Sequence, residues 1–261
     1  VVATNHLIGE AAGLFVTASL WEYGGHQRHR GIAREILERE ILEQTFDDGA
    51  TREATSWYHQ FVTHFFEMVA RTAQATGEPM SAPFLERLSR MKQYLQAMAT
   101  RGAVVRYGDA DDGWAIAFKG DQEAWRERVF GPLDLSDAET PTFFPSAQQV
   151  ALRAHSSYLF ARAGAFGMGG AGYSSHAHDD LLSPILFLAG LPILADPGTG
   201  VNNGDRTMRA KYRTAEAHNG LTLSGTPRPE QRMNFGWHSI RPAAHFREVT
   251  PTSATGQYGE T

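Results

Sequence analysis

The stretch YSSHAHDDLLSPILFLAGLPILADPGTG, from Tyr173 to Gly200, predicts two short strands joined by a tight turn. The runs ILFL and LPIL are apolar, and Ala189-Gly190 between them suits the tip of a β-hairpin. A His-x-His pair precedes this hairpin, and Asp196 follows it. The stretch therefore predicts antiparallel β-structure, with side chains of the metal-binding kind at both ends of an apolar hairpin.

The residues that follow Phe143 show the same pattern of short apolar runs between turn residues. The segments VALRAHSSYLFARAG, NGLTLSG and HFREVTP are short runs separated by turn residues. Several short strands at such intervals are typical of an antiparallel β-sandwich, so residues 143–261 form the predicted β domain. The chain stops at GQYGET, within apparent β-structure, and we expect it to be part of a longer protein.

Residues 1–102 predict helices instead of strands. The apolar spacing indicates one helix from Thr4 or Asn5, a second that ends at DDG, a third over roughly 52–75, and a fourth from Pro83 to about 100. Long antiparallel helices with short connections predict helical hairpins arranged as an α/α toroid. The intervening residues 103–142 contain the acidic runs GDADDG and DLSDAETP and the strand-like GWAIAFKG, and we interpret them as a linker with first strands.

The bulk composition narrows the class of protein. The chain has 261 residues and a formal net charge of −5, so no overall basic field points to nucleic acid. It has no cysteine, and any metal site must use His, Asp or Glu. The apolar start VVATNHLIGEAAGLFVTASL is interrupted by Asn5, His6 and Glu10, which favours a buried helix over a membrane span. The segment GGHQRHR is a basic loop that either contacts an acidic ligand or is solvated.

Three residues of the predicted β domain, one of them a histidine of the His-x-His pair, could bind a metal ion together. Alternate residues of a strand share a face, so His176 and His178 point the same way. Asp196 ends the return strand, and His218 starts another predicted strand. Two imidazoles and a carboxylate suit a tetrahedral zinc ion with one position left for another ligand. In the alternative, His218 caps a turn, Asp196 hydrogen-bonds its own turn and one histidine is merely exposed.

The helical half contains a second group of candidates. Asn5 and His6 open the first helix, and Glu10 lies one turn after His6 on the same face. The alternative is a helix cap followed by a solvated pair. Tyr58 lies on an aromatic-rich helix, where a tyrosine commonly belongs to the core.

Four blocks of this sequence match a known pattern. TNHLIGEAAGLFVTASLW matches an Asn-His-Gly-Glu helix, and DDGATREATSWYHQFV matches an Asp-Gly, Glu, Ser and Tyr-His pattern. GYSSHAHDDLLSPILFLAGLPILADPGTG and MRAKYRTAEAHNGLTLSG match a His-x-His-x-Asp block and a Tyr-Arg-x-Thr block. In these features the chain resembles the heparinase II/III family of polysaccharide lyases, which includes similar oligoalginate lyases. It departs from the family at SSHAHDD, at AHNG, and at the tyrosine that is common after PGTG.

The resemblance implies an α+β multidomain fold, with an α/α toroid followed by an antiparallel β-sandwich and a cleft between them. It implies a lyase that cleaves uronic-acid polysaccharides, such as heparan sulfate, alginate, hyaluronan or exopolysaccharide, by β-elimination. The expected location is periplasmic or secreted. The expected partner is an acidic polysaccharide or oligosaccharide, with no nucleic acid and no membrane span, and a homodimer is possible.

The resemblance also implies roles for individual residues. Asn5 and His6 would neutralise the carboxylate of the sugar, and Tyr58 would serve as base and then as acid. His176 is the alternative base or a second contact to the carboxylate. Glu10, Tyr212 and Arg213 would contact the substrate, while His178, Asp196 and His218 would hold one mainly structural zinc ion per chain.

Two other functions remain open at the level of the sequence. A zinc-dependent glycan hydrolase would use the metal to activate water, although no glutamate stands beside the His-x-His pair as an obvious general base. An inactive carbohydrate-binding module would keep the fold without the chemistry.

Overall fold

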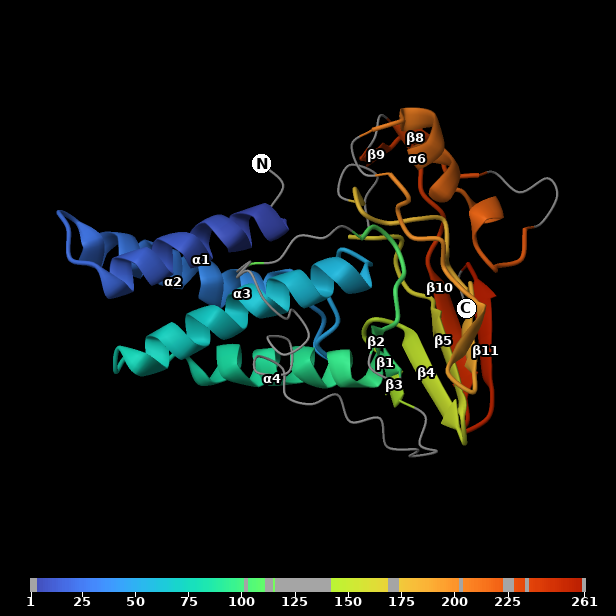
Figure 1. Cartoon of the computed structure of the whole chain (residues 1–261), viewed down its shortest axis with the longest axis horizontal. Coiled ribbons are helices and arrows are strands. Elements are labelled where there is room, and N and C mark those ends of the chain that lie inside the picture. The colour runs from blue at the N-terminus through green and yellow to red at the C-terminus, as the bar shows by residue number, and fades with distance from the viewer. Residues whose placement is uncertain are drawn as a thin grey trace. The chain divides into compact units, whose positions relative to one another are not determined.

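The structure is a computed structural model that describes residues 4–100, 103–110, 115, 142–168, 174–201, 204–222, 228–232 and 235–259. It divides into two compact units (Figure 1). The first, here called the helical unit, comprises Val1–Thr51, Tyr58–Tyr94 and Asp112–Leu133. The second, here called the β unit, comprises Arg52–Trp57, Leu95–Asp111 and Asp134–Thr261.

Four long helices lie in the first hundred residues, as the apolar spacing predicts. They are α1 (Asn5–Leu20), α2 (His26–Glu43), α3 (Ser56–Ala75) and α4 (Ala82–Ala97). Helices α1 and α2 pack against each other as a hairpin (Figure 1). Thr4 is the N-cap residue of α1, as predicted, but its side chain makes no capping hydrogen bond.

The core of the helical unit comes from apolar residues spaced three or four apart. In α1, Ile8, Ala11 and Phe15 are almost fully buried and contribute to one cluster with residues of the other three helices. Phe66 of α3 meets Phe84 of α4 edge to face, with ring centroids 5.6 Å apart. Burial of such a stripe, rather than helix propensity, supplies most of the stability of a helix in a protein.

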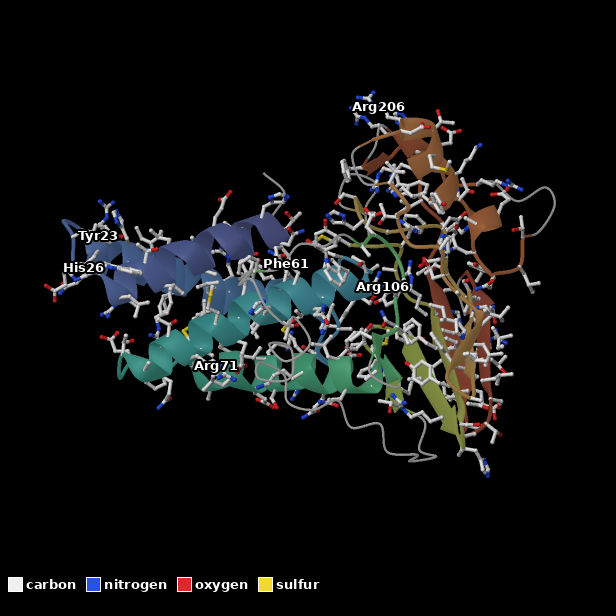
Figure 2. The ribbon with its side chains drawn as sticks, viewed as in Figure 1. Tyr23, His26, Phe61, Arg71, Arg106 and Arg206 are labelled. Atoms are coloured by element: carbon white, nitrogen blue, oxygen red, sulfur yellow. The ribbon has the colours of Figure 1, made fainter. Side chains whose placement is uncertain are left out.

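The segment GGHQRHR is not a loop over its whole length. Helix α2 begins at His26, and Tyr23 and His26 lie together at the turn between α1 and α2 (Figure 2). Their ring centroids are 5.9 Å apart, and His26 Nδ1 lies 2.8 Å from the carbonyl oxygen of Tyr23. The polar residues that favour a loop are accommodated here because the first turn of a helix is open to solvent.

The β unit contains a five-stranded antiparallel sheet with the order β3-β4-β5-β6-β7. Its hairpin β6–β7 confirms the predicted turn, since Ala189 and Gly190 have φ values of 50° and 80°. Two central residues with positive φ match the right-handed twist of the flanking strands. The five strands are β3 (Thr142–Phe144), β4 (Gln149–Ala154), β5 (Ser157–Arg162), β6 (Ile185–Leu188) and β7 (Leu191–Leu194).

The remaining elements of the β unit are short. Three further antiparallel pairs are described, β1–β2, β8–β9 and β10–β11, and a helix and a 3₁₀ turn lie between β7 and β8. Their bounds are β1 Ala99–Thr100, β2 Ala103–Val104, α6 Arg206–Tyr212, η2 Ala215–Ala217, β8 Gln231–Arg232, β9 Gly236–Trp237, β10 Ala244–Val249 and β11 Ala254–Tyr258.

The first part of the predicted linker is packed into the β unit. Tyr107 is buried and stacks on Phe160 of β5, with ring centroids 5.2 Å apart. Asp109 is 1% exposed. Residues 103–110 therefore differ from a solvated linker, whereas the strand-like GWAIAFKG, apart from Ala115, and the run DLSDAETP lie outside the described residues.

Two predicted strands are absent where the structure describes the chain. Residues 174–184 form turns and coil, so the His-x-His pair does not lie on a strand. His218 directly follows η2, and no strand is present at 218–222. Hydrogen bonds from side chains of both segments to other parts of the β unit hold them in place, instead of the backbone hydrogen bonds of paired strands. The closure of the helices into an α/α toroid stays a prediction. The packing of two sheets into a β-sandwich also stays a prediction.

No helix within the described part of the chain combines the length and the apolar character that a membrane crossing requires. The apolar helix α1 is interrupted by polar residues, as the sequence indicates.

Candidate functional site

The three predicted zinc ligands lie together in the β unit. His178, Asp196 and His218 each offer a ligand atom, and these atoms all lie within 4.8 Å of one another. His178 lies on the loop before β6, Asp196 follows β7, and His218 ends the 3₁₀ turn. The two imidazole rings have centroids 5.3 Å apart. The fold thus brings three separate segments to one point.

The hydrogen bonds around these histidines fit a metal ion. His178 Nε2 lies 2.9 Å from Asp109 Oδ1, and His218 Nδ1 lies 3.0 Å from Asp196 Oδ2. The other ring nitrogen of each, Nδ1 of His178 and Nε2 of His218, is buried without a hydrogen-bond partner. A buried polar atom without a partner is costly, and a metal ion would supply the missing interaction. The nitrogen and oxygen donors present are those that zinc accepts.

Asp196 has a second partner. Its Oδ1 accepts a hydrogen bond of 2.8 Å from the backbone N–H of Gly198. The turn contact that the sequence offered as an alternative to metal binding is therefore present. It does not exclude metal binding, because a ligating carboxylate is commonly oriented by a hydrogen bond of its own.

Buried charges surround His178, Asp196 and His218, here called the triad. Asp180 is buried and paired with Arg162 of β5, whose Nε lies 2.9 Å from Asp180 Oδ1. Burial by itself would raise the pKa of Asp180, but the charge of Arg162 lowers it overall. Burial likewise opposes protonation of His218, but its hydrogen bond to Asp196 and the nearby charge of Asp180 raise the pKa of that imidazole. Carboxylate and guanidinium groups are therefore buried together beside the triad.

His176, the predicted alternative base, lies beside these three residues and is held by the same carboxylate as His178. Its Nδ1 lies 3.0 Å from Asp109 Oδ2, and its ring meets Phe235 edge to face at 6.2 Å. Arg209 Nη2 donates to the same Oδ2 at 2.5 Å, and its guanidinium lies 4.3 Å from the Phe235 ring centroid. Burial by itself would raise the pKa of Asp109, but hydrogen bonds from His176, His178 and Arg209 hold it well below its usual range.

The loop that carries His176 is fixed by a buried arginine. Arg213 is fully buried, and its Nη2 donates to the carbonyl oxygens of Ser175 and Ala177 at 3.2 and 3.3 Å. Its guanidinium lies over Trp237, 4.5 Å from the ring centroid, and burial lowers its pKa to about 10. These contacts position the loop, and a direct contact between Arg213 and substrate stays a prediction.

Tyr212, the other predicted substrate contact from this block, is half-buried. A Cβ atom built on Gly200 would lie 2.3 Å from the tyrosine ring. Gly200 has a φ of +63°, so this position requires glycine both for its backbone and for the space that Tyr212 occupies. Tyr212 thereby packs against the turn that follows Asp196.

Asp109 and Arg209 are residues of this site to which the sequence analysis gave no role, although Arg209 lies in the block MRAKYRTAEAHNGLTLSG that carries the resemblance. Asp109 lies in GDADDG, which we interpreted as part of a linker because it is acidic and turn-like. Its backbone N–H donates to the carbonyl of His176 at 3.1 Å, and its own carbonyl accepts from Thr55 Oγ1. The only signal available was the apolar run AVVRYG before it, which indicates a segment that packs before it turns.

The candidates from the helical half all lie near helix starts in the helical unit. Asn5 is buried in the first turn of α1, while His6 and Glu10 are exposed on the same helix. Tyr58 of α3 is 8% exposed and meets Phe61 edge to face at 6.2 Å.

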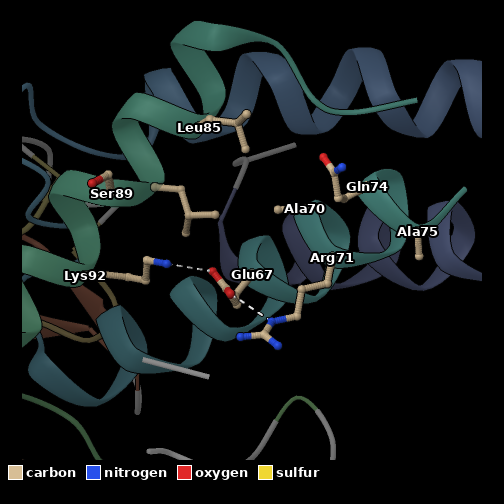
Figure 3. A pocket seen from close by; sticks show the side chains of 9 residues that line it. Glu67, Ala70, Arg71, Gln74, Ala75, Leu85, Ser89 and Lys92 are labelled. Atoms are coloured by element: carbon tan, nitrogen blue, oxygen red, sulfur yellow. Dashed lines mark hydrogen bonds and ion pairs between the residues drawn. The ribbon is translucent and has the colours of Figure 1, made fainter. Parts of the chain in front are cut away.

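A separate hollow of about 510 Å³ lies in the helical unit between α3 and α4 (Figure 3). Glu67 in its wall pairs with Arg71 at 2.9 Å and with Lys92 at 3.1 Å. None of the predicted catalytic, substrate-binding or metal-binding residues lines this hollow.

Comparison with known families accounts for both halves of the chain. The family model described as Heparinase II/III N-terminus matches residues 2–125, and the one described as Heparinase II/III-like, C-terminal, matches residues 136–258. The chain therefore belongs to the heparinase II/III-like family. A search of curated proteins gave no match.

Solved structures share this fold. A heparinase III with methylated lysines has a TM-score of 0.74 and 17% identity, over 97% of this chain and 40% of that one. A second heparinase III structure has a TM-score of 0.72 and 17% identity, over 94% and 41%. Heparan sulfate lyase HepC from Pedobacter heparinus has a TM-score of 0.66 and 19% identity, over 94% and 41%. The chain spans about two fifths of the length of these structures.

Proposed function

We propose that this chain carries the catalytic residues of a polysaccharide lyase that cleaves a uronic-acid polysaccharide by β-elimination. The observation that carries the proposal is the position of His176 next to the His178–Asp196–His218 triad, in a chain that matches the family at both ends. The structural similarity to a heparinase III and to a heparan sulfate lyase supports the same class of reaction.

The reaction sets three demands. The proton on C5 of the uronate is weakly acidic, so the neighbouring carboxylate must be neutralised as negative charge develops. A base removes that proton, and the electron pair forms the C4–C5 double bond as the bond from C4 to the glycosidic oxygen breaks. An acid then protonates the departing oxygen.

His176 and Tyr58 are the proposed proton-transfer groups. Because Nδ1 of His176 is directed at a carboxylate, the neutral ring carries its proton there and presents Nε2 as the acceptor. Tyr58 would act as base and then as acid, with His176 as the alternative base. Asn5 and His6 would donate hydrogen bonds to the sugar carboxylate, and Glu10 and Tyr212 would contact neighbouring hydroxyl groups.

We also propose one zinc ion per chain, held by His178, Asp196 and His218. When bound, zinc would tie the three segments together and place a fixed positive charge in the β unit. Its part would be mainly structural. The buried imidazole nitrogens without partners support this assignment.

A substrate that is a polymer also bears on location. A charged polysaccharide does not cross a bilayer unaided, because the transfer of charged groups into hydrocarbon is costly. We therefore propose that the protein acts in the periplasm or after secretion.

The test is a panel of heparan sulfate, alginate, hyaluronan and a bacterial exopolysaccharide, each incubated with the purified chain. Elimination gives new chain ends that absorb in the ultraviolet, because the C4–C5 double bond is conjugated with the carboxylate. New reducing ends without this absorbance would indicate a zinc-dependent hydrolase and overturn the proposal. Binding without any product would indicate a carbohydrate-binding module and overturn it as well.

A further inference from the structure

We propose that Asp109 is a positioning residue that sets which nitrogen of His176 and which nitrogen of His178 faces the reacting site. A single buried carboxylate would thus orient the proposed alternative base, His176, and a proposed metal ligand, His178, at the same time. The roles of the two histidines rest on the proposed function, but the orientation of their rings does not.

The geometry assigns one carboxylate oxygen to each ring. Oδ1 of Asp109 lies 2.9 Å from His178 Nε2, and Oδ2 lies 3.0 Å from His176 Nδ1. Arg209 donates to Oδ2 at 2.5 Å, and Thr199 Oγ1 lies 3.3 Å from Oδ1. Asp109 is 1% exposed, so it cannot itself touch a polymeric substrate.

The carboxylate can only accept hydrogen bonds, because the adjacent guanidinium of Arg209 favours its ionised form. Each histidine must therefore direct an N–H at Asp109, which fixes opposite nitrogens in the two rings. In His178 the unprotonated atom is then Nδ1, the buried nitrogen without a hydrogen-bond partner, which is left to bind the proposed metal ion. In His176 the unprotonated atom is Nε2, the atom that would accept the C5 proton.

The backbone around Asp109 is held closely enough for this task. Its N–H donates to the carbonyl oxygen of His176 at 3.1 Å. Gly108 precedes it with a φ of +67°, and a Cβ atom there would lie 2.7 Å from the carbonyl oxygen of Ala54. Only glycine permits this approach, so the main chain at Gly108 and Asp109 is held between Ala54 and the loop that carries His176.

The first experiment reads the tautomers directly. Long-range proton–nitrogen NMR on ¹⁵N-histidine-labelled protein, with metal removed by chelation and no substrate added, reports which ring nitrogens carry protons. His176→Gln and His178→Gln assign the signals. We expect His178 to carry its proton on Nε2 and His176 on Nδ1. The reverse tautomer at either ring would overturn the proposal.

The second experiment compares Asp109→Asn with Asp179→Asn. The amide of asparagine can accept from one ring only, so we expect zinc affinity, measured by competition with a chromophoric chelator, to fall about 10–100-fold. Asp179 is a matched control, because it is also buried and paired with an arginine, Arg241, but contacts neither imidazole. Its variant should keep zinc affinity within about threefold.

On a cleaved polysaccharide, Asp109→Asn should lower kcat while KM stays near wild type, since Asp109 does not contact substrate. Unchanged zinc affinity together with unchanged tautomers in Asp109→Asn would overturn the proposal. Should this variant fail to fold, the tautomers of the wild-type protein still decide the matter. A failure of the proposed function can be distinguished from a failure of the proposal for Asp109. Neither the zinc affinity nor the histidine tautomers depend on cleavage of a polysaccharide.

Discussion

At the scale of single residues, the metal triad gives a direct test. His218→Ala removes a ligand whose Nε2 is buried without a partner, so we expect zinc content, measured by mass spectrometry of the metal, to fall far below one ion per chain. His155→Ala, which removes an exposed histidine of the β unit, is the matched control and should keep the ion. Full zinc occupancy in His218→Ala would remove that histidine from the ligand set.

Tyr58 gives a second test at this scale. Tyr58→Phe deletes one oxygen from a largely buried ring, so the edge contact with Phe61 and the melting temperature should change little. A positioned acid–base group contributes about 10²–10⁴-fold, and turnover on the cleaved polysaccharide should fall on that order. Near-normal turnover would transfer the base role to His176.

At the scale of elements, α3 and α4 are joined by a buried histidine. His59 of α3 is fully buried, and its Nε2 lies 3.1 Å from the carbonyl oxygen of Met91 in α4. Burial lowers its pKa from 6.5 to about 4, against the raising effect of the hydrogen bond to Met91. The folded helices therefore keep this imidazole neutral at a pH where the unfolded chain binds a proton.

The sign of the resulting pH dependence follows from linkage. Stability from this residue is fully present above the unfolded pKa of 6.5 and is lost as the pH falls from 6.5 towards 4. Between pH 7 and pH 5 the free energy of unfolding should fall by about 2 kcal/mol through His59 alone. Urea unfolding followed by helical circular dichroism at the two pH values should show a smaller difference in His59→Gln. His6→Gln, which removes an exposed imidazole of the same unit, should leave the difference as in wild type.

The elements also show how far the sequence can be interpreted. The four helices were predictable because each buries a stripe of apolar residues three or four apart, and the hairpin β6–β7 because Ala189-Gly190 suits its turn. The loop of His176 and His178 was taken for a strand, since a His-x-His pair has the period of one. Asp109 could not be found by pattern, because its two imidazole partners lie 67 and 69 residues away and only the tertiary fold brings them together.

At the scale of the whole molecule, the division into two units would make the effect of the proposed metal ion local. His178, Asp196 and His218 all belong to the β unit, so a bound ion stabilises that unit by mass action. Hydrogen exchange followed by mass spectrometry should show faster exchange after chelation at 185–194 and 215–218, with α1 and α2 unchanged. Equal acceleration in both units would contradict a metal site confined to the β unit.

Because two histidines share the carboxylate of Asp109, substitutions at this site would differ in their effect during evolution. A lineage that lost His176 but kept His178 would still need Asp109, whereas one that lost Asp109 would weaken both histidines in a single step. On the proposed roles, a substitution of His176 would remove one function only. A substitution of Asp109 would disturb the orientation of both His176 and His178. On the proposed roles, descendants that retain Asp109 and His178 without His176 would have lost the alternative base and kept the proposed metal ligand.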